Sequence, residues 1–259
     1  MKALIQSTQN GIPKTVNFYA AFQGFHELGI ETRSFCTLEE LSDWQPDELI
    51  VGGLGSVLPK LREYGVEPPE LDYPESLNAY LGRRVWRTTL DRILAEKECC
   101  PVFVKPVRDK LFTGFVLRTN RDLPKLSHCS PQEPVLCSEV VPFLAEWRVF
   151  VRYGQILDVR PYYGNWRVSY RANVIENALR DFTDAPAGFA LDFGVIQSGE
   201  TLLVEVNDGF SLGCYGLEPV SYARLLSARW AELTGIADEC DMDHAGTEWK
   251  NKNRSANRQ

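Results

Sequence analysis

Residues 190–209, with the sequence ALDFGVIQSGETLLVEVNDG, constrain the fold of this chain more than any other stretch. Two strand-like runs, 191–197 and 201–207, flank a Ser-Gly pair, which is typical of a β-hairpin. If the turn takes two residues, counting outward places Asp192 directly opposite Glu205. The Cβ atoms of such cross-strand neighbours lie only about 4.5–5.5 Å apart, so two like charges there repel each other. The pattern therefore predicts a positive group between the two carboxylates.

The same hairpin indicates a metal site. Asn207 follows Glu205 by two residues and therefore shares its strand face. Two carboxylates and an amide oxygen form an all-oxygen ligand set, which suits Mg²⁺. A solvated hairpin face can also carry acids, but both faces of this hairpin are apolar, unlike those of a surface hairpin with one wet side. We therefore predict that Asp192, Glu205 and Asn207 ligate a divalent cation.

The N-terminal section has the pattern of a small α/β domain. Strand-like runs at 1–7, 32–36 and 49–51 are interspersed with a helical stretch that begins near Thr15 and ends at Gly29. The last run leads into Gly-Gly-Leu-Gly, which matches neither the dinucleotide-binding fingerprint nor the phosphate-loop pattern. We interpret these glycines as a tight turn between a strand and a helix.

The proline-rich segment 67–74 indicates a domain boundary. We predict an N-terminal α/β domain over residues 1–76, a larger domain over 77–237 and a polar tail over 238–259. The helices expected in the larger domain are 77–94, 171–182 and 219–233.

Two further strands are expected at 102–105 and 115–118, and the first of them ends at Lys105. A lysine at a strand end can simply protect the edge of a sheet. It can also act as a point charge against a triphosphate, with the backbone amides of Thr113 and Gly114 closing over the phosphates. The loop alone does not decide between these two roles.

A second hairpin is expected at 147–153 and 156–161, around a Gly-Gln turn. With a two-residue turn there, Arg160 pairs with Val149, and Arg148 points to the opposite face of the sheet. On this register, the two arginines cannot both enter one cleft.

The strand expected at 135–141 is broken by Pro142, in a segment that Glu139 and Glu146 bracket. A broken strand leaves backbone N–H and C=O groups without ladder partners. An adenine ring needs such an edge, so this segment is a candidate for binding a nucleotide base.

The order of these features resembles the ATP-grasp superfamily over roughly residues 80–217. The most specific parts are the interval of thirteen residues from Asp192 to Glu205, the Glu-x-Asn motif that begins at Glu205, and the interval of seven residues from Glu139 to Glu146. The segment EWRVFV, which begins at Glu146, is similar to a strand of the branch that includes ribosomal-protein glutamate ligases. The resemblance implies an α+β fold in which the small α/β domain precedes two α+β subdomains that clamp ATP.

The resemblance also implies a nucleotide site. Lys105 would contact the α- and β-phosphates, the backbone of the hinge would bind adenine, and Glu146 would bind the ribose hydroxyls. Many members have a second, upstream lysine on phosphate, where this chain offers Arg83 and Arg84. The residues implied to bind the nucleotide are Lys105, Lys110, Thr113, Gly114, Glu139, Val140, Val141 and Glu146.

The implied cofactors are ATP and one or two Mg²⁺ ions, with Mn²⁺ as an alternative metal, held by Asp192, Glu205 and Asn207. Arg160 or Arg148 would meet the γ-phosphate or an acylphosphate. The implied reaction is ligation of a carboxylate to an amine through an acylphosphate, with small-molecule or peptide substrates. A phosphotransferase on the same site and a nucleotide-binding module without catalysis are the alternatives.

Composition disfavours several other classes of protein. The net charge is −7, whereas a protein that binds duplex nucleic acid normally shows a basic footprint. No stretch approaches the roughly 18 apolar residues of a membrane span. The three histidines are widely separated, and the seven cysteines match no zinc spacing. We expect a cytoplasmic enzyme with reduced thiols.

Overall fold

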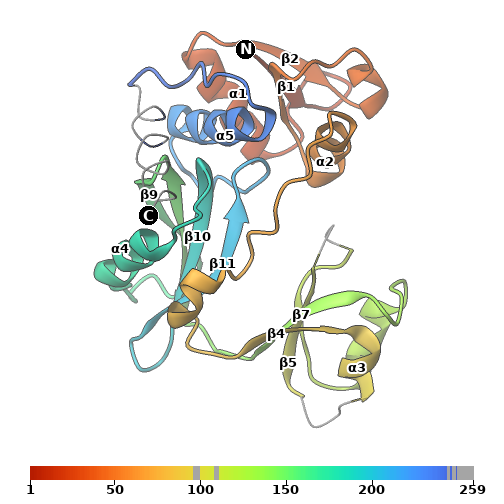
Figure 1. Ribbon diagram of the computed structural model, residues 1–259, viewed down its shortest axis with the longest axis vertical. Coiled ribbons are helices and arrows are strands. Elements are labelled where there is room, and N and C mark those ends of the chain that lie inside the picture. Colours follow the sequence, from red (N-terminus) through yellow and green to blue (C-terminus); the bar gives the residue numbers. More distant parts are fainter. Residues whose placement is uncertain (96–99, 108–110, 244–245, 247–248, 250–259) are drawn as a thin grey trace.

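The computed structural model describes residues 1–95, 100–107, 111–243, 246 and 249. Over these residues the strands form three sheets (Figure 1), with strand orders β2-β1-β3, β4-β7-β5-β6 and β11-β10-β8-β9. We call the second the small sheet and the third the large sheet; the small sheet lies apart from the other two, at the bottom of the view. None of the helices in the described part of the chain is long and apolar enough to cross a membrane.

The N-terminal sheet is parallel. Thr15 begins the first helix, because its Oγ1 accepts a hydrogen bond from the backbone N–H of Phe18 at 3.2 Å. Gly53 begins the second helix and donates its N–H to Oε1 of Gln6 at 3.0 Å, so the glycine run is indeed a strand-to-helix turn. The elements are β1 (Lys2–Gln6), α1 (Val16–Glu27), β2 (Glu31–Phe35), β3 (Glu48–Val51) and α2 (Leu54–Glu63).

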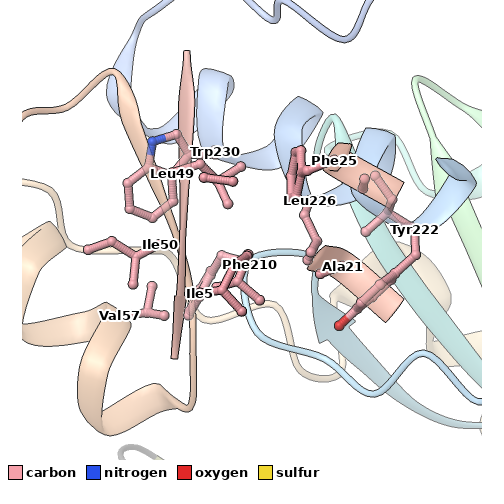
Figure 2. Packing of buried hydrophobic residues seen from close by; sticks show 14 of the residues in the cluster. Ile5, Ala21, Phe25, Leu49, Ile50, Val57, Phe210, Tyr222, Leu226 and Trp230 are labelled. Carbon is pink, nitrogen blue, oxygen red and sulfur yellow. The ribbon is translucent and has the colours of Figure 1, made fainter. Parts of the chain in front are cut away.

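The last helix, α5 (Pro219–Thr234), completes the core of this N-terminal sheet. Figure 2 shows Trp230, Tyr222 and Leu226 of α5 among side chains of the first sheet and α1. Gly24 allows the close approach of the two helices, since a Cβ there would lie 1.9 Å from the carbonyl oxygen of Pro219. The predicted boundary at residue 76 stays a prediction, but the N-terminal section and α5 share one apolar core.

The small sheet is antiparallel and corrects one prediction. The helix expected over 77–94 is wrong: it is replaced by a 3₁₀ helix (Glu75–Tyr80), a strand and a short helix. Gly82, at a φ of +58°, interrupts the helical pattern, and the following Val-Trp-Arg-Thr-Thr favours a strand. The elements are β4 (Val85–Thr89), α3 (Leu90–Ala95), β5 (Val102–Pro106), β6 (Phe115–Leu117), a 3₁₀ helix (Asn120–Leu126) and β7 (Pro134–Glu139).

The large sheet is also antiparallel. One face packs on α4 through a core that includes Val149, Leu191, Phe193 and Leu203. The other face turns in part toward α5 and in part toward the small sheet. The elements are β8 (Ala145–Arg152), β9 (Gln155–Gly164), α4 (Ala172–Asp181), β10 (Gly188–Val195) and β11 (Thr201–Asp208).

The loop between β10 and β11 is one residue longer than the sequence suggests. The N–H of Ile196 donates to the carbonyl of Glu200 at 3.1 Å, and the N–H of Gly199 donates to the carbonyl of Ile196 at 2.9 Å. Gly199 has a φ of +81°, which is typical of a three-residue hairpin loop. The predicted two-residue turn is therefore wrong.

A β-bulge compensates for that error. Next to the loop, Phe193 faces Leu203, but one step further Asp192 faces Glu205, so Val204 is the additional residue. The predicted opposition of Asp192 and Glu205 is thus correct, although it depends on a longer loop and a bulge that cancel in the count.

The hairpin of β8 and β9 overturns a second register. The turn residues are Tyr153 and Gly154, with φ values of +48° and +71°, as in a type I′ turn. With this turn alone, Arg160 would pair with Trp147. A β-bulge at Leu157, between the pairs of Val151 and Phe150, shifts the register by one residue, so Arg160 pairs with Arg148 and not with Val149. The prediction that the two arginines lie on opposite faces is wrong, because the turn sits one residue earlier than expected and the bulge then brings Arg160 to the face of Arg148.

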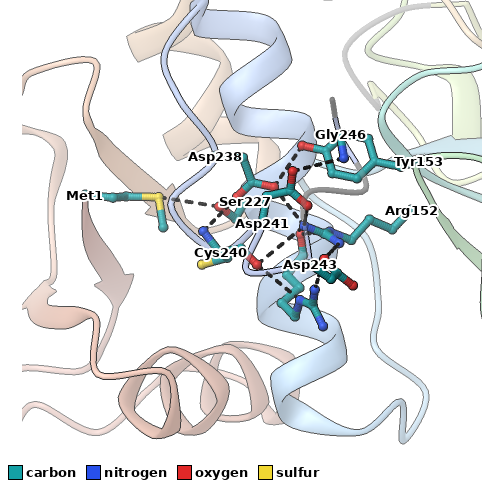
Figure 3. A network of polar contacts seen from close by, with 10 residues as sticks. Met1, Arg152, Tyr153, Ser227, Asp238, Cys240, Asp241, Asp243 and Gly246 are labelled. Atoms are coloured by element: carbon teal, nitrogen blue, oxygen red, sulfur yellow. Dashed lines mark hydrogen bonds and ion pairs between the residues drawn. The ribbon is translucent and has the colours of Figure 1, made fainter. Parts of the chain in front are cut away.

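The beginning of the predicted polar tail is bound to the body of the protein. Figure 3 shows Arg152 and Tyr153 in contact with Asp238, and Arg152 also pairs with Asp241. Cys240 is buried, and its carbonyl accepts a hydrogen bond from Arg224 at 3.2 Å. These contacts fix the first residues after α5.

Candidate active site

A pocket of about 520 Å³ lies between the small sheet and the large sheet. The small sheet and the loop between β5 and β6 form one wall of the pocket, and β11 forms the opposite wall. The proline-rich connector, residues 67–74, forms a third wall. The polar and charged residues along the pocket are Glu70, Asp72, Arg87, Lys105, Thr113, Glu205, Asn207, Asp208 and Ser211.

One face of the large sheet carries a row of charges beside this pocket. Asp192 stands opposite Arg148 on one side and opposite Glu205 on the other, so the three side chains share a face. Glu146 and Asn207 lie two residues away along β8 and β11, on the same face. Further along this face, Phe150 and Ala190 are fully buried in the core beneath α5. One part of this face of the sheet therefore packs in the core, and the other part carries the charged side chains.

Asp192 and Arg148 form a buried, two-pronged ion pair. Nε and Nη2 of Arg148 donate to the two carboxylate oxygens of Asp192 at 2.8 and 2.7 Å, and both side chains are almost fully buried. Asn207 also donates to Asp192, at 3.2 Å. Burial raises the pKa of Asp192 to about 6 although Arg148 opposes the rise, and the charges of Glu205 and Glu146 add to it.

Lys105, at the end of β5, reaches across the pocket to the large sheet. Its Nζ donates to Oε2 of Glu205 at 3.0 Å, pairs with the carboxylate of Asp72, and lies 4.7 Å from the ring centre of Tyr73. Burial alone would lower the pKa of Lys105, but the carboxylates of Asp72 and Glu205 raise it above its ordinary value. Lys105 therefore stays protonated and positively charged in the middle of the site.

Asp72 is a site residue that the sequence did not reveal. It lies in the proline-rich connector, where no periodicity or motif singles it out. Burial raises its pKa, and its Oδ1 is buried without a hydrogen-bond partner among the described residues. Tyr73 follows at a φ of +56°, an uncommon backbone conformation that turns the connector toward the pocket.

The balance of charge fits a divalent cation. Four carboxylates, those of Asp72, Glu146, Asp192 and Glu205, meet the charges of Lys105 and Arg148 at this site. The oxygens of the carboxylates and of Asn207 are ligands that Mg²⁺ prefers. Among the described residues, no three acidic, histidine or cysteine side chains converge as a ready metal cluster; Lys105 and Arg148 hold the carboxylates instead. The metal assignment of Asp192, Glu205 and Asn207 stays a prediction that this chemistry supports.

The other residues implied to bind the nucleotide lie at different distances from the pocket. Thr113 and Gly114 line it, whereas Lys110 lies outside the described residues. Glu139 ends β7 and accepts a hydrogen bond from the backbone N–H of Arg84 at 2.9 Å. Val140 and Val141 follow it in the segment that joins the two sheets.

Glu146 and Arg160 extend the charged face away from the pocket. Glu146 accepts a hydrogen bond from the hydroxyl of Tyr162 at 2.7 Å, and burial raises its pKa. Arg160 is more exposed, and its Nη1 donates to Asp158 at 3.3 Å. Arg148, with its guanidinium 4.8 Å from the ring centre of Tyr215, is the more enclosed of the two arginines.

Comparison with known families agrees with this geometry. A model of the ATP-grasp domain, R2K clade family 2, matches residues 80–225, which is more than half of the chain. The protein therefore belongs to the ATP-grasp superfamily, and within it to this family. The predicted fold is confirmed, and ATP with Mg²⁺ is confirmed as the expected cofactor pair. A search of curated proteins finds no match.

Solved structures share the fold at low sequence identity. D-cycloserine synthetase DcsG matches with a TM-score of 0.58 and 11% identity, over 88% of this chain and 99% of its own. The RimK domain protein ATP-grasp from Sphaerobacter thermophilus DSM 20745 matches with a TM-score of 0.54 and 13% identity, over 86% and 98%. D-alanine–D-alanine ligase from Bacillus anthracis matches with a TM-score of 0.51 and 13% identity, over 98% of both chains.

Proposed function

We propose that this protein is an ATP- and Mg²⁺-dependent ligase that activates a carboxylate as an acylphosphate and joins it to an amine. The observation that carries the proposal is the convergence of Lys105, Glu205 and the Asp192–Arg148 pair beside one pocket. Two of the structural neighbours are named a ligase and a synthetase, which favours ligation over simple phosphotransfer. A cytoplasmic location is part of this proposal.

The reaction needs position and charge more than covalent help from the protein. A carboxylate oxygen of the substrate forms a bond to the γ-phosphorus of ATP. At the same time, the bond between the γ-phosphorus and the bridging oxygen breaks, and that oxygen leaves with ADP. The amine nitrogen then bonds to the acyl carbon, phosphate leaves, and the nitrogen gives up a proton. Bound Mg²⁺ neutralises phosphate oxygens in this chemistry.

The residues of this chain have distinct tasks in that scheme. Lys105 binds phosphate as a point charge, and the backbone of Thr113 and Gly114 covers it. Glu205 and Asn207 supply oxygen ligands beside it. Arg148, already enclosed next to Asp192, holds a positive charge where the transferred phosphoryl group carries negative charge.

The test is turnover with a chemical trap. The protein is incubated with ATP, Mg²⁺ and panels of carboxylates and amines, including peptides, and ADP release is followed. Hydroxylamine should convert the activated acid to a hydroxamate, which a phosphotransferase would not give. Absence of ADP release across the panels would favour a nucleotide-binding module and contradict the ligase.

Glu205→Gln should lower the rate of turnover more than about 100-fold, because charge stabilisation through a metal ion is worth several kcal/mol. Glu200→Gln is the matched control, since Glu200 is an exposed acid on the same hairpin. Full activity of the Glu205→Gln enzyme would contradict the assignment of Glu205 as a metal ligand.

A further inference from the structure

The bulge at Val204 decides which face of β11 reaches the active site. Between the loop and the bulge, Val195 pairs with Thr201 and Phe193 with Leu203. If that register continued, Asp192 would face Val204, and Glu205 would turn toward the apolar core on the opposite face. The bulge shifts the register by one residue and so brings Glu205 and Asn207 to the side of Asp192.

Arg83 binds the backbone at this bulge. Its Nη1 donates to the carbonyl of Leu203 at 2.6 Å, and its Nη2 donates to the carbonyl of Val204 at 2.8 Å. In a regular strand, consecutive carbonyls point to opposite edges, so one guanidinium could not bind both. In the described part of the chain, β11 is an edge strand, and no strand on its outer side holds the bulge.

The surroundings of Arg83 hold it in that place. Gly82, at a φ of +58°, lies so close to β11 that a Cβ would be 2.5 Å from the side chain of Leu202. The guanidinium of Arg83 lies 5.7 Å from the ring centre of Tyr73 and 5.9 Å from that of Phe143. Nη1 also donates to the carbonyl of Leu81 at 3.0 Å.

We propose that Arg83 is a positioning residue for the ATP and Mg²⁺ site, and that it acts by clamping the bulge which orients Glu205 and Asn207. The proposal rests on the proposed function only in taking these two side chains, with Asp192, as metal ligands. It gives Arg83 a task different from direct contact with phosphate, since both Nη atoms are engaged by backbone carbonyls.

The test combines Arg83→Met with deletion of Val204. Deletion removes the additional residue, so Asp192 and Glu205 stay opposite each other in a regular hairpin that needs no clamp. Mg²⁺-dependent binding of a non-hydrolysable ATP analogue is measured by calorimetry for the wild type, each single variant and the double variant. Arg83→Met should weaken binding about tenfold or more in the wild-type background, as for other groups that support metal ligands, and much less in the deletion background.

Equal losses in the two backgrounds would show that Arg83 contacts the nucleotide directly and would overturn the clamp. Arg92→Met, an exposed arginine on α3, is the control and should bind as the wild type does. If Arg83→Met does not fold, Arg83→Lys serves in its place: it keeps the charge but cannot bind both carbonyls with two parallel N–H groups. Wild-type binding by Arg83→Lys would contradict the clamp, whereas failure of the wild type itself to bind would contradict the proposed function.

Discussion

Two buried Asp–Arg pairs on the large sheet have nearly the same geometry. Asp192 receives Nε and Nη2 of Arg148 at 2.8 and 2.7 Å, and Asp208 receives the same atoms of Arg229 at 2.7 and 2.6 Å. Burial raises the pKa of both aspartates, and the arginine partner opposes the rise in each case. Geometry alone therefore does not distinguish a structural pair from a functional one.

The surroundings of the pairs do distinguish them. Arg229 lies on α5, also binds Glu232 at 2.7 Å, and has its Cβ against the backbones of Gly188 and Gly209. This pair joins the end of the sheet to the last helix. Asp208 itself lines the pocket, but Arg229 and Glu232 lie on α5 and not in the lining. Arg148 and Asp192, by contrast, belong to a group of four carboxylates and two cations, of which Lys105, Asp72 and Glu205 line the pocket. We therefore take the larger excess of negative charge around a pair, and not the ion pair itself, as the mark of the candidate functional site.

The largest effect on folding is expected at the pair on α5. Arg229→Met leaves the buried carboxylate of Asp208 without its partner, and the free energy of unfolding should fall by about 3–5 kcal/mol. Urea denaturation measures this change. Arg180→Met, an exposed arginine on α4, is the control. A loss of less than about 1 kcal/mol would show that the Asp208–Arg229 pair contributes little to the stability of the fold.

The second prediction concerns the Asp192–Arg148 pair, where a substitution should change turnover more than stability. Asp192→Asn keeps the shape of the side chain but removes one negative charge, and it should lower ATP turnover about 100-fold, within the several kcal/mol that a metal ion contributes. Its cost to the free energy of unfolding should be smaller than that of Asp208→Asn, since repulsion from Glu205 and Glu146 is relieved. The reverse order of stabilities would break the comparison.

A smaller effect is expected at the connector. Asp72 shares the ammonium of Lys105 with Glu205, so a phosphate group must compete with it for that charge. Asp72→Asn should therefore bind an ATP analogue up to about tenfold more tightly, a change of about 1.4 kcal/mol. Fluorescence titration measures the affinity, with the exposed Asp43→Asn as control. Weaker binding would show that Asp72 supports the bound nucleotide instead of competing with it.

Most of the strands, and the meeting of Asp192 with Glu205, could be predicted from local pattern, whereas β4 was expected to be helical. Alternation of apolar residues located the strands, and the spacing along one hairpin brought Asp192 and Glu205 together. That success depended on a three-residue loop and a bulge of opposite effect, neither of which was expected.

Other features depend on contacts between distant segments, which spacing along the chain does not encode. Asp72 reaches the site because the connector folds between the two sheets, and Arg83 reaches β11 in the same way. The register that places Arg160 beside Arg148 depends on a bulge in β9 and on Tyr153 adopting a positive φ, which is uncommon for a bulky residue.

The central claim is that the acidic face of β10 and β11 binds ATP through a divalent cation. Isothermal titration of the wild type and of Glu205→Gln with a non-hydrolysable ATP analogue, with and without Mg²⁺, tests it most directly. We predict a saturable binding heat for the wild type that requires Mg²⁺ and is largely lost in Glu205→Gln. Binding that is equally strong without Mg²⁺, or unchanged by the substitution, would contradict the claim.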